Sequence, residues 1–158
     1  MHLVIDEDRA NANSRITAIR AAVMLMRSME LWRRDRLDSQ NVFIILAVIS
    51  ITSEKLMRAQ MEAKYNTLDT YLPLEQLQGC NVASIAAATG QNRETVRRRV
   101  QGLISSGSLI RTEAGEIALP PEKVNENSAL VLVRKQLEAL VRFANDSLRD
   151  GVLRPGGP

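Results

Sequence analysis

Arginine side chains are concentrated between Gln91 and Arg111, where the chain carries five arginines and a single acid, Glu94. The five are Arg93, Arg97, Arg98, Arg99 and Arg111. Five positive charges against one negative charge leave a local surplus of four, whereas the whole chain has a formal net charge of +3. A planar guanidinium donates paired hydrogen bonds to phosphates and to guanine edges. These residue types therefore favour the non-covalent binding of an anionic partner.

Side chains that support covalent chemistry are scarce. Cys80 is the only cysteine and His2 the only histidine, which excludes an intrachain disulfide, a cluster of several thiolates on a metal, and Ser-His-Asp or Cys-His catalysis. The sequence also lacks a glycine-rich phosphate loop. We therefore expect no enzyme and no cofactor, with a site built only on carboxylates and lysines as the remaining catalytic alternative. We interpret Cys80 as a small buried hydrophobe rather than a redox sensor.

The arginines lie on a predicted helix that runs from about Arg93 to Ser106. Val96, Val100 and Leu103 are spaced so that they form one apolar stripe along this helix. At about 100° per residue, Arg98 projects almost opposite the stripe, and Arg97 and Arg99 lie on its flanks. A solvated charged face is the ordinary alternative for such a run. The shortage of acids nearby favours a binding surface instead.

A shorter helix and a tight turn are predicted directly before the arginine-rich helix. Asn81 is a suitable N-cap for a helix over Val82 to Ala88. Gly90 can take the positive φ that a tight turn between two helices requires. Asn92 can then cap the next helix through its side-chain oxygen. The pattern predicts two helices that cross at a short turn.

A β-hairpin is predicted after the arginine-rich helix. The segments Leu109–Thr112 and Ile117–Leu119 flank an Ala-Gly pair that can form the turn. The tip of this hairpin carries Glu113 and Glu116, which disfavours deep insertion into a nucleic-acid groove. Arg111, at its base, is the better contact for a phosphate or a groove.

Long apolar helices are predicted on both sides of this central region. The first runs from Asn13 to Arg34, and a second from Gln40 to Met61 is capped by Asp38 or Ser39. A last helix, from Ser128 to Arg149, has a heptad-like apolar stripe. The apolar faces of the first and last helices are expected to form a dimer interface or, alternatively, to pack against each other as an antiparallel pair within one chain. They contain Ile16, Ile19, Val23, Met26, Leu130, Val133, Leu137, Leu140 and Ala144.

The segments between and beyond these helices are predicted to be irregular. Residues 62–79 are interpreted as a connection with one short helical turn near Leu74–Leu77. We expect His2 to lie in a mobile N-terminal segment, and the chain to be disordered from Gly151 through the tail Arg154–Pro158.

The segment from Ile85 to Arg97, together with Leu103, Gly107 and Arg111, resembles bacterial winged-helix transcriptional regulators of the MarR and GntR families. Arg93, Thr95, Val96 and Arg97 match the Arg-x-Thr-Val-Arg run typical of GntR-type recognition helices. The flanking helices are more similar to the MarR architecture, in which terminal helices interleave in a homodimer. Arg99 departs from the pattern, because these families usually have an apolar residue there.

The resemblance implies a mainly α-helical, winged helix-turn-helix protein that binds double-stranded DNA as a homodimer. Arg93, Arg97 and Arg98 are then candidates for guanine contacts, Thr95 for a thymine methyl or a phosphate, and Glu94 for a cytosine amino group. Gln91, Asn92, Arg99 and Arg111 are candidates for positioning on the DNA backbone. The alternative is a winged helix that serves as a protein-interaction module in a larger assembly.

The expected organisation has three parts. Residues 1–36 provide an N-terminal dimerisation helix, residues 37–120 the winged helix-turn-helix domain, and residues 121–158 a C-terminal dimerisation helix and disordered tail. The acidic start lacks the pattern of a signal peptide, and the apolar run Val42–Ile51 is too short to span a bilayer. We therefore expect a cytoplasmic protein without membrane contact. A small-molecule effector of unknown identity is a further partner that the sequence leaves open.

Overall fold

A computed structural model of the chain describes residues 2–33, 37–58, 66–67, 79–124 and 127–157. The described part is mainly helical, with short antiparallel strands. It forms two compact units. The central unit spans Asp35–Leu130, and the terminal unit combines Met1–Arg34 with Val131–Pro158. Among the described residues, no helix combines the length and apolar character that crossing a membrane requires.

The central unit contains four helices and a hairpin within its described residues. The helices are α3 (Ser39–Arg58), α4 (Val82–Thr89), α5 (Arg93–Ser105) and α6 (Pro121–Val124). Strands β2 (Ile110–Arg111) and β3 (Ile117–Ala118) pair antiparallel, and Cys80 forms an isolated bridge to the other side of β3 through Ile117. The predicted helices and hairpin of this region are thus present, with bounds within about three residues of those expected.

The core of the central unit is built mainly from α3, α4, α5, β3 and Leu109, which directly precedes β2. Val42, Ile44 and Val48 of α3 are fully buried, so the apolar run of this helix contributes to the core, whereas Phe43 in the same run is 45% exposed. α4 and α5 add Ile85 and Val96, both also fully buried. The hairpin closes this core with Leu109 and Ile117, so one apolar cluster holds α3, α4, α5 and β3 together.

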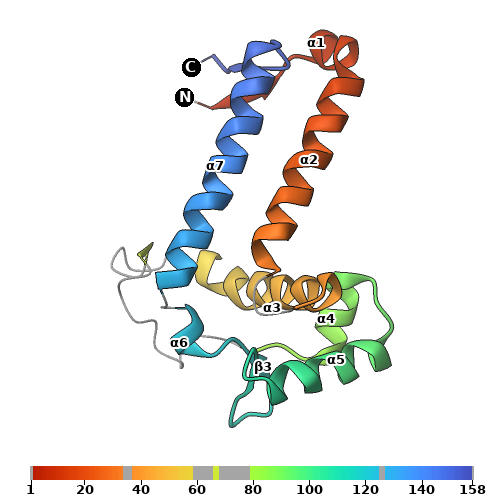
Figure 1. The fold of residues 1–158 in the computed structure, drawn as a ribbon, viewed down its shortest axis with the longest axis vertical. Coiled ribbons are helices and arrows are strands. Elements are labelled where there is room, and N and C mark those ends of the chain that lie inside the picture. Colours follow the sequence, from red (N-terminus) through yellow and green to blue (C-terminus); the bar gives the residue numbers. More distant parts are fainter. Residues whose placement is uncertain (1, 34–36, 59–65, 68–78, 125–126, 158) are drawn as a thin grey trace. The chain divides into compact units, whose positions relative to one another are not determined.

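The terminal unit is built from both ends of the chain. Its N-terminal part contains β1 (Leu3–Ile5), α1 (Glu7–Ala12) and α2 (Ser14–Trp32). Its C-terminal part contains α7 (Asn127–Arg149) from Val131 onward and β4 (Leu153–Pro155). β1 and β4 pair antiparallel, so the two ends lie side by side (Figure 1). Arg20 of α2 forms an ion pair with Asp150, just after α7.

Two expectations for the terminal unit are wrong. The chain is not disordered after Gly151, because Leu153–Pro155 form a strand, and the backbone N–H of Gly156 donates to the His2 carbonyl. His2 is for the same reason tied to the fold rather than mobile. The first helix is also preceded by α1, whose N-cap Asp6 accepts a hydrogen bond from the backbone of Arg9. The connection predicted over residues 62–79 lies almost entirely outside the described residues.

Candidate nucleic-acid interface

The turn between α4 and α5 has the local geometry that its residue types predict. Asn81 caps α4 by accepting a hydrogen bond from the backbone N–H of Ser84, with an N···O distance of 2.9 Å. Gly90 ends this helix with a φ of +66°, a left-handed conformation that glycine adopts without strain. Asn92 caps α5 through a 2.9 Å bond from the backbone N–H of Glu94. Capping side chains therefore fix the starts of both helices, and Gly90 provides the turn between them.

Helix α5 has one buried side and one exposed side. Val96, Val100 and Leu103 are at most 2% exposed, which confirms the predicted apolar stripe. The opposite side is exposed to solvent, and it carries Arg93, Glu94, Arg97, Arg98, Gln101 and Gly102. Since the buried stripe fixes the rotation of α5, these polar side chains are held outward.

An ion pair on the exposed side links Arg97 to Glu94. The guanidinium donates two hydrogen bonds to the two carboxylate oxygens, at 2.8 and 2.7 Å. These hydrogen bonds, with a smaller contribution from the opposite charges, lower the pKa of the Glu94 carboxyl and raise the pKa of Arg97. Both side chains are well exposed, so this pair is weak and open to exchange with an external anion.

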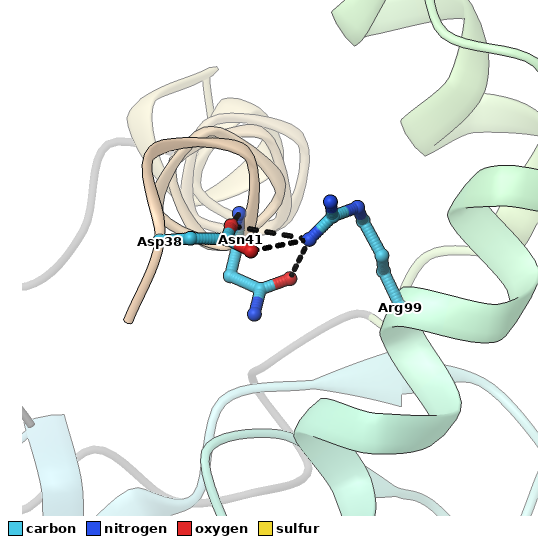
Figure 2. A network of polar contacts seen from close by, with 3 residues as sticks. All are labelled: Asp38, Asn41 and Arg99. Atoms are coloured by element: carbon cyan, nitrogen blue, oxygen red, sulfur yellow. Dashed lines mark hydrogen bonds and ion pairs between the residues drawn. The ribbon is translucent and has the colours of Figure 1, made fainter. Parts of the chain in front are cut away.

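Arg99 is directed into the protein rather than outward. Its Nη1 donates hydrogen bonds to both Asp38 carboxylate oxygens, at 3.1 and 2.8 Å, and to the Asn41 side-chain oxygen, at 3.0 Å (Figure 2). Asp38 also accepts from the backbone N–H of Asn41 and so caps α3. The Arg99 hydrogen bonds, followed by the bond from the Asn41 backbone, hold the pKa of Asp38 below its ordinary value. This network fastens α5 to the start of α3.

The Arg99 network gives the half-buried guanidinium its acceptors and corrects the charge count. An apolar residue at this position would pack against α3, whereas Arg99 makes the same connection through hydrogen bonds. The sequence count found few acids near the arginines because Asp38 lies 61 positions away along the chain. One of the five positive charges is therefore matched by an acid from another helix.

The hairpin is anchored at its base and at one edge. The Arg111 side chain donates to the Gly115 carbonyl at 2.7 Å, across the turn. Glu116 does not point freely from the tip, because its carboxylate accepts a hydrogen bond from the backbone N–H of Gly79. A side chain on Gly79 would begin only 2.3 Å from the Glu116 Cβ, so the close approach requires glycine there.

Cys80 is buried, and its surroundings suppress its reactivity. Desolvation raises the pKa of the thiol to about 11, with a smaller contribution from the negative charge of Glu116. A thiol with this pKa remains protonated and a poor nucleophile near neutral pH. This agrees with the interpretation of Cys80 as a small core residue.

The nine residues predicted to contact DNA thus fall into three groups in the structure. Arg93 and Arg98 are exposed, and neither makes a hydrogen bond or ion pair with another side chain that the structure describes. Glu94, Arg97 and Arg111 are exposed but engaged in local contacts. The third group has structural roles or is partly covered. Asn92 caps α5, and Arg99 belongs to the network with α3. Gln91 and Thr95 are half-buried beside the turn.

Sequence reasoning missed the second role of Asp38 and any role of Asn41. Asp38 was recognised as a helix cap, but nothing in a linear pattern links it to Arg99. A usable indication was the position of Arg99 on the flank of the buried stripe, since a half-buried arginine needs an acceptor. Comparison with known proteins adds no relative, because no family model, no curated protein and no solved structure matches this chain.

Proposed function

We propose that this chain binds double-stranded DNA in a sequence-specific manner through a winged helix-turn-helix formed by α3, α4, α5 and the β2–β3 hairpin. The observation that carries the proposal is the orientation of α5. Val96, Val100 and Leu103 hold one side in the core, and the other side presents Arg93, Arg97 and Arg98 to solvent. A helix presented in this way enters a major groove with its N-terminal half against the base edges.

The distribution of exposed apolar side chains favours DNA over the protein-interaction alternative. A protein-binding surface has an apolar centre. Within residues 79–123, which contain α4, α5 and the hairpin, no large hydrophobic side chain is strongly exposed, and Phe43, which is 45% exposed, lies on α3. The exposed side of α5 is instead polar and basic, as expected for contact with phosphates and bases.

The contacts assign different tasks to the arginines. Arg93 and Arg98 are the candidates for bidentate contacts with guanine or phosphate, because their donors are not engaged by the described side chains. Arg97 can leave its exposed pair with Glu94 when an anion approaches. Arg99 acts within the protein by fixing α5 against α3, so its guanidinium is not a candidate for direct contact with the DNA backbone.

The test compares two double variants that remove the same charge. Arg93→Ala with Arg98→Ala is expected to weaken specific binding at least tenfold, since each bidentate base contact contributes about 1–3 kcal/mol. Arg15→Ala with Arg134→Ala removes two exposed arginines from the terminal unit and should leave binding nearly unchanged. A site selected from random duplexes provides the ligand, and mobility shifts at several salt concentrations provide the affinities.

Two results would contradict the DNA-binding proposal. One is equal affinity of the two double variants for the selected site. The other is affinity that does not change between low and physiological salt, because neutralised phosphates must release counterions.

We further propose that the protein acts as a homodimer whose interface includes α2 and α7. The residues of α2 and α7 that are predicted to form the dimer interface are accessible to solvent in the single chain. Exposed fractions run from 39% for Ile16 to 69% for Met26 on α2, and from 41% for Leu130 to 55% for Leu137 on α7. Ala144 is half-buried. A monomeric soluble protein rarely leaves such a set of large apolar side chains in water.

The orientation of α7 supports a partner outside its own chain. Between α2 and α7 lies an open groove of about 620 Å³, to which α7 contributes Ala139, Phe143 and charged neighbours. At about 100° per residue, Leu137 and Leu140 lie on the side of α7 away from this groove. Packing of α2 against α7 within one chain, the alternative for covering both apolar faces, therefore leaves the α7 stripe uncovered. A second copy would cover it symmetrically.

A further inference from the structure

The backbone hydrogen bonds between β1 and β4 determine which groups point outward. The register pairs Leu3 with Pro155, Val4 with Arg154 and Ile5 with Leu153. The N–H of Asp6 donates to the Val152 carbonyl at 3.0 Å, and the N–H of Gly156 donates to the His2 carbonyl at 2.8 Å. In an antiparallel pair such bonds occur at every second residue. Residues 2, 4 and 6 therefore face β4, and the backbone groups of Leu3 and Ile5 face away from it.

The two outer edges of this ribbon are not equivalent. On the β4 edge, Pro155 lacks an N–H, so that edge cannot offer a complete row of donors and acceptors. On the β1 edge, Leu3 and Ile5 each offer an N–H and a carbonyl. Their side chains are 47% and 58% exposed and point to the same face of the ribbon. An exposed edge with apolar side chains is a template for another strand.

We propose that β1 pairs antiparallel with β1 of a second copy of this chain, which joins two ribbons into one four-stranded sheet. The inference rests on the homodimer of the proposed function and adds a second region to its interface. In the symmetric register, Leu3 lies opposite Ile5 of the second copy, and Val4 lies opposite Val4. Leu3 and Ile5 then exchange up to about four backbone hydrogen bonds between the copies.

A second copy explains features that another peptide would not. The sequence around Val4 is self-complementary, because the two apolar residues on the free edge exchange places under a two-fold rotation. The pairing ends at four strands, since Pro155 then blocks both outer edges. The free edge of β1 also belongs to the same unit as the exposed apolar residues of α2 and α7, so one partner can cover the edge and these residues.

The direct test places a cysteine on the proposed two-fold axis. Opposed residues that are not hydrogen-bonded to each other have Cα atoms about 4.5 Å apart, within the range of a disulfide. Val4→Cys should therefore form covalent dimers rapidly under mild oxidation, as seen on a non-reducing gel. Arg154→Cys is the matched control, because its position pairs with Val4 but lies on the far strand of each ribbon. It should cross-link at least tenfold more slowly, and Cys80 is too buried to contribute.

A second test acts on the backbone rather than on the side chain. Leu3→Pro removes an outward N–H and leaves the donors that face β4 in place, so the dimer dissociation constant should rise about 10- to 100-fold. Leu3→Val keeps the N–H and should change this constant by less than about fivefold. The dissociation constants come from sedimentation equilibrium. Protection of the Leu3 and Ile5 amides from hydrogen exchange gives a third measurement, on the unmodified chain.

The outcomes separate this inference from the proposed function. Equal cross-linking of the two cysteine variants, or unprotected Leu3 and Ile5 amides in a dimeric parent, overturns the strand pairing alone. A parent that remains monomeric overturns the pairing and the homodimer together. Efficient cross-linking at Val4 in a protein that binds no DNA supports the pairing and contradicts the DNA-binding proposal.

Discussion

The central and terminal units both contain helices with apolar faces, but they bury these faces very differently. In the central unit α3, α4, α5 and the hairpin share a core in which Ile44, Ile85 and Leu109 are completely buried. In the described part of the terminal unit, only Ser147 and Val152 are buried, and α2 has no buried residue at all. The central unit can thus be stabilised by its own core. The terminal unit has its apolar side chains in place but lacks a surface to bury them against.

The largest expected effect comes from charges placed on the α7 stripe. Leu137→Asp with Leu140→Asp would put unpaired carboxylates in the proposed dimer interface, which is strongly unfavourable. The parent should have twice the 17.6 kDa chain mass by light scattering, and the double variant should be monomeric or unfolded in its terminal unit. Lys135→Asp, on the opposite side of α7, serves as the control. If the parent is a stable monomer at micromolar concentration, the contrast between the units needs a different explanation.

Truncating one isoleucine in each unit tests the difference in burial between the central and terminal units. Ile85→Ala in the central core should lower the free energy of unfolding by about 3 kcal/mol, whatever the protein concentration. Ile19 is 54% exposed in the single chain. Ile19→Ala should therefore reduce stability only where dimers are populated, so its effect on Tm should grow with concentration. Thermal unfolding at two protein concentrations a hundredfold apart measures the Tm of both variants. A fall in Tm for Ile19→Ala that does not depend on concentration would argue against the dimer.

A smaller effect is expected where α5 is fastened to α3. Arg99→Ala should cost about 1 kcal/mol, because it removes hydrogen bonds to Asp38 and Asn41. Since the folded pKa of Asp38 is lowered, its contribution is present above the unfolded pKa of about 4 and is lost as the pH falls through the lower folded value. The Tm difference between parent and Asp38→Asn should thus be constant near neutral pH and shrink below about pH 4. A difference that persists unchanged at pH 2 would contradict this ion pair.

The smallest effect concerns two glycines of the central unit. Gly102 lies within α5, and a methyl group there would meet no atom within 4 Å apart from its chain neighbours and the backbone of its own helix. Gly102→Ala should therefore raise the free energy of unfolding by about 0.5–1 kcal/mol through helix propensity. Gly79→Ala should lower it, because the new Cβ would collide with Glu116. Denaturant titration compares the two, and a destabilised Gly102→Ala would mean that this side of α5 is not open.

The sequence predicts the central unit better than the terminal unit, for a physical reason. Asn81, Gly90 and Asn92 act on backbone groups only two or three residues away, so their types determine caps and a turn without knowledge of the fold. The Val96 stripe is likewise a property of one helix. By contrast, the bond between Arg99 and Asp38 and the pairing of β1 with β4 join distant segments. Such contacts depend on the assembled fold, which local patterns do not contain.

The start of the terminal unit could nevertheless have been predicted from local sequence patterns. Asp6 followed by Glu7 and Asp8 is a helix start, with a cap and an acidic first turn, and α1 begins there. The strand-forming residues Leu3–Ile5 lie directly before it. What no local pattern provides is the partner strand, because Leu153–Pro155 is short and ends in a proline.

The pairing of β1 with β4 also has a consequence for the order of folding. Bringing the two strands together closes a loop of almost the whole chain, and the entropic cost of closure rises with the logarithm of loop length. The central unit lies between the two strands in the sequence and has its own core. When this unit folds, most of the flexible loop becomes compact structure. Refolding should therefore show two kinetic phases, with the core residues of α3 and α5 protected first. The strands would follow in a slower phase, consistent with the low rate of forming contacts between residues far apart in sequence.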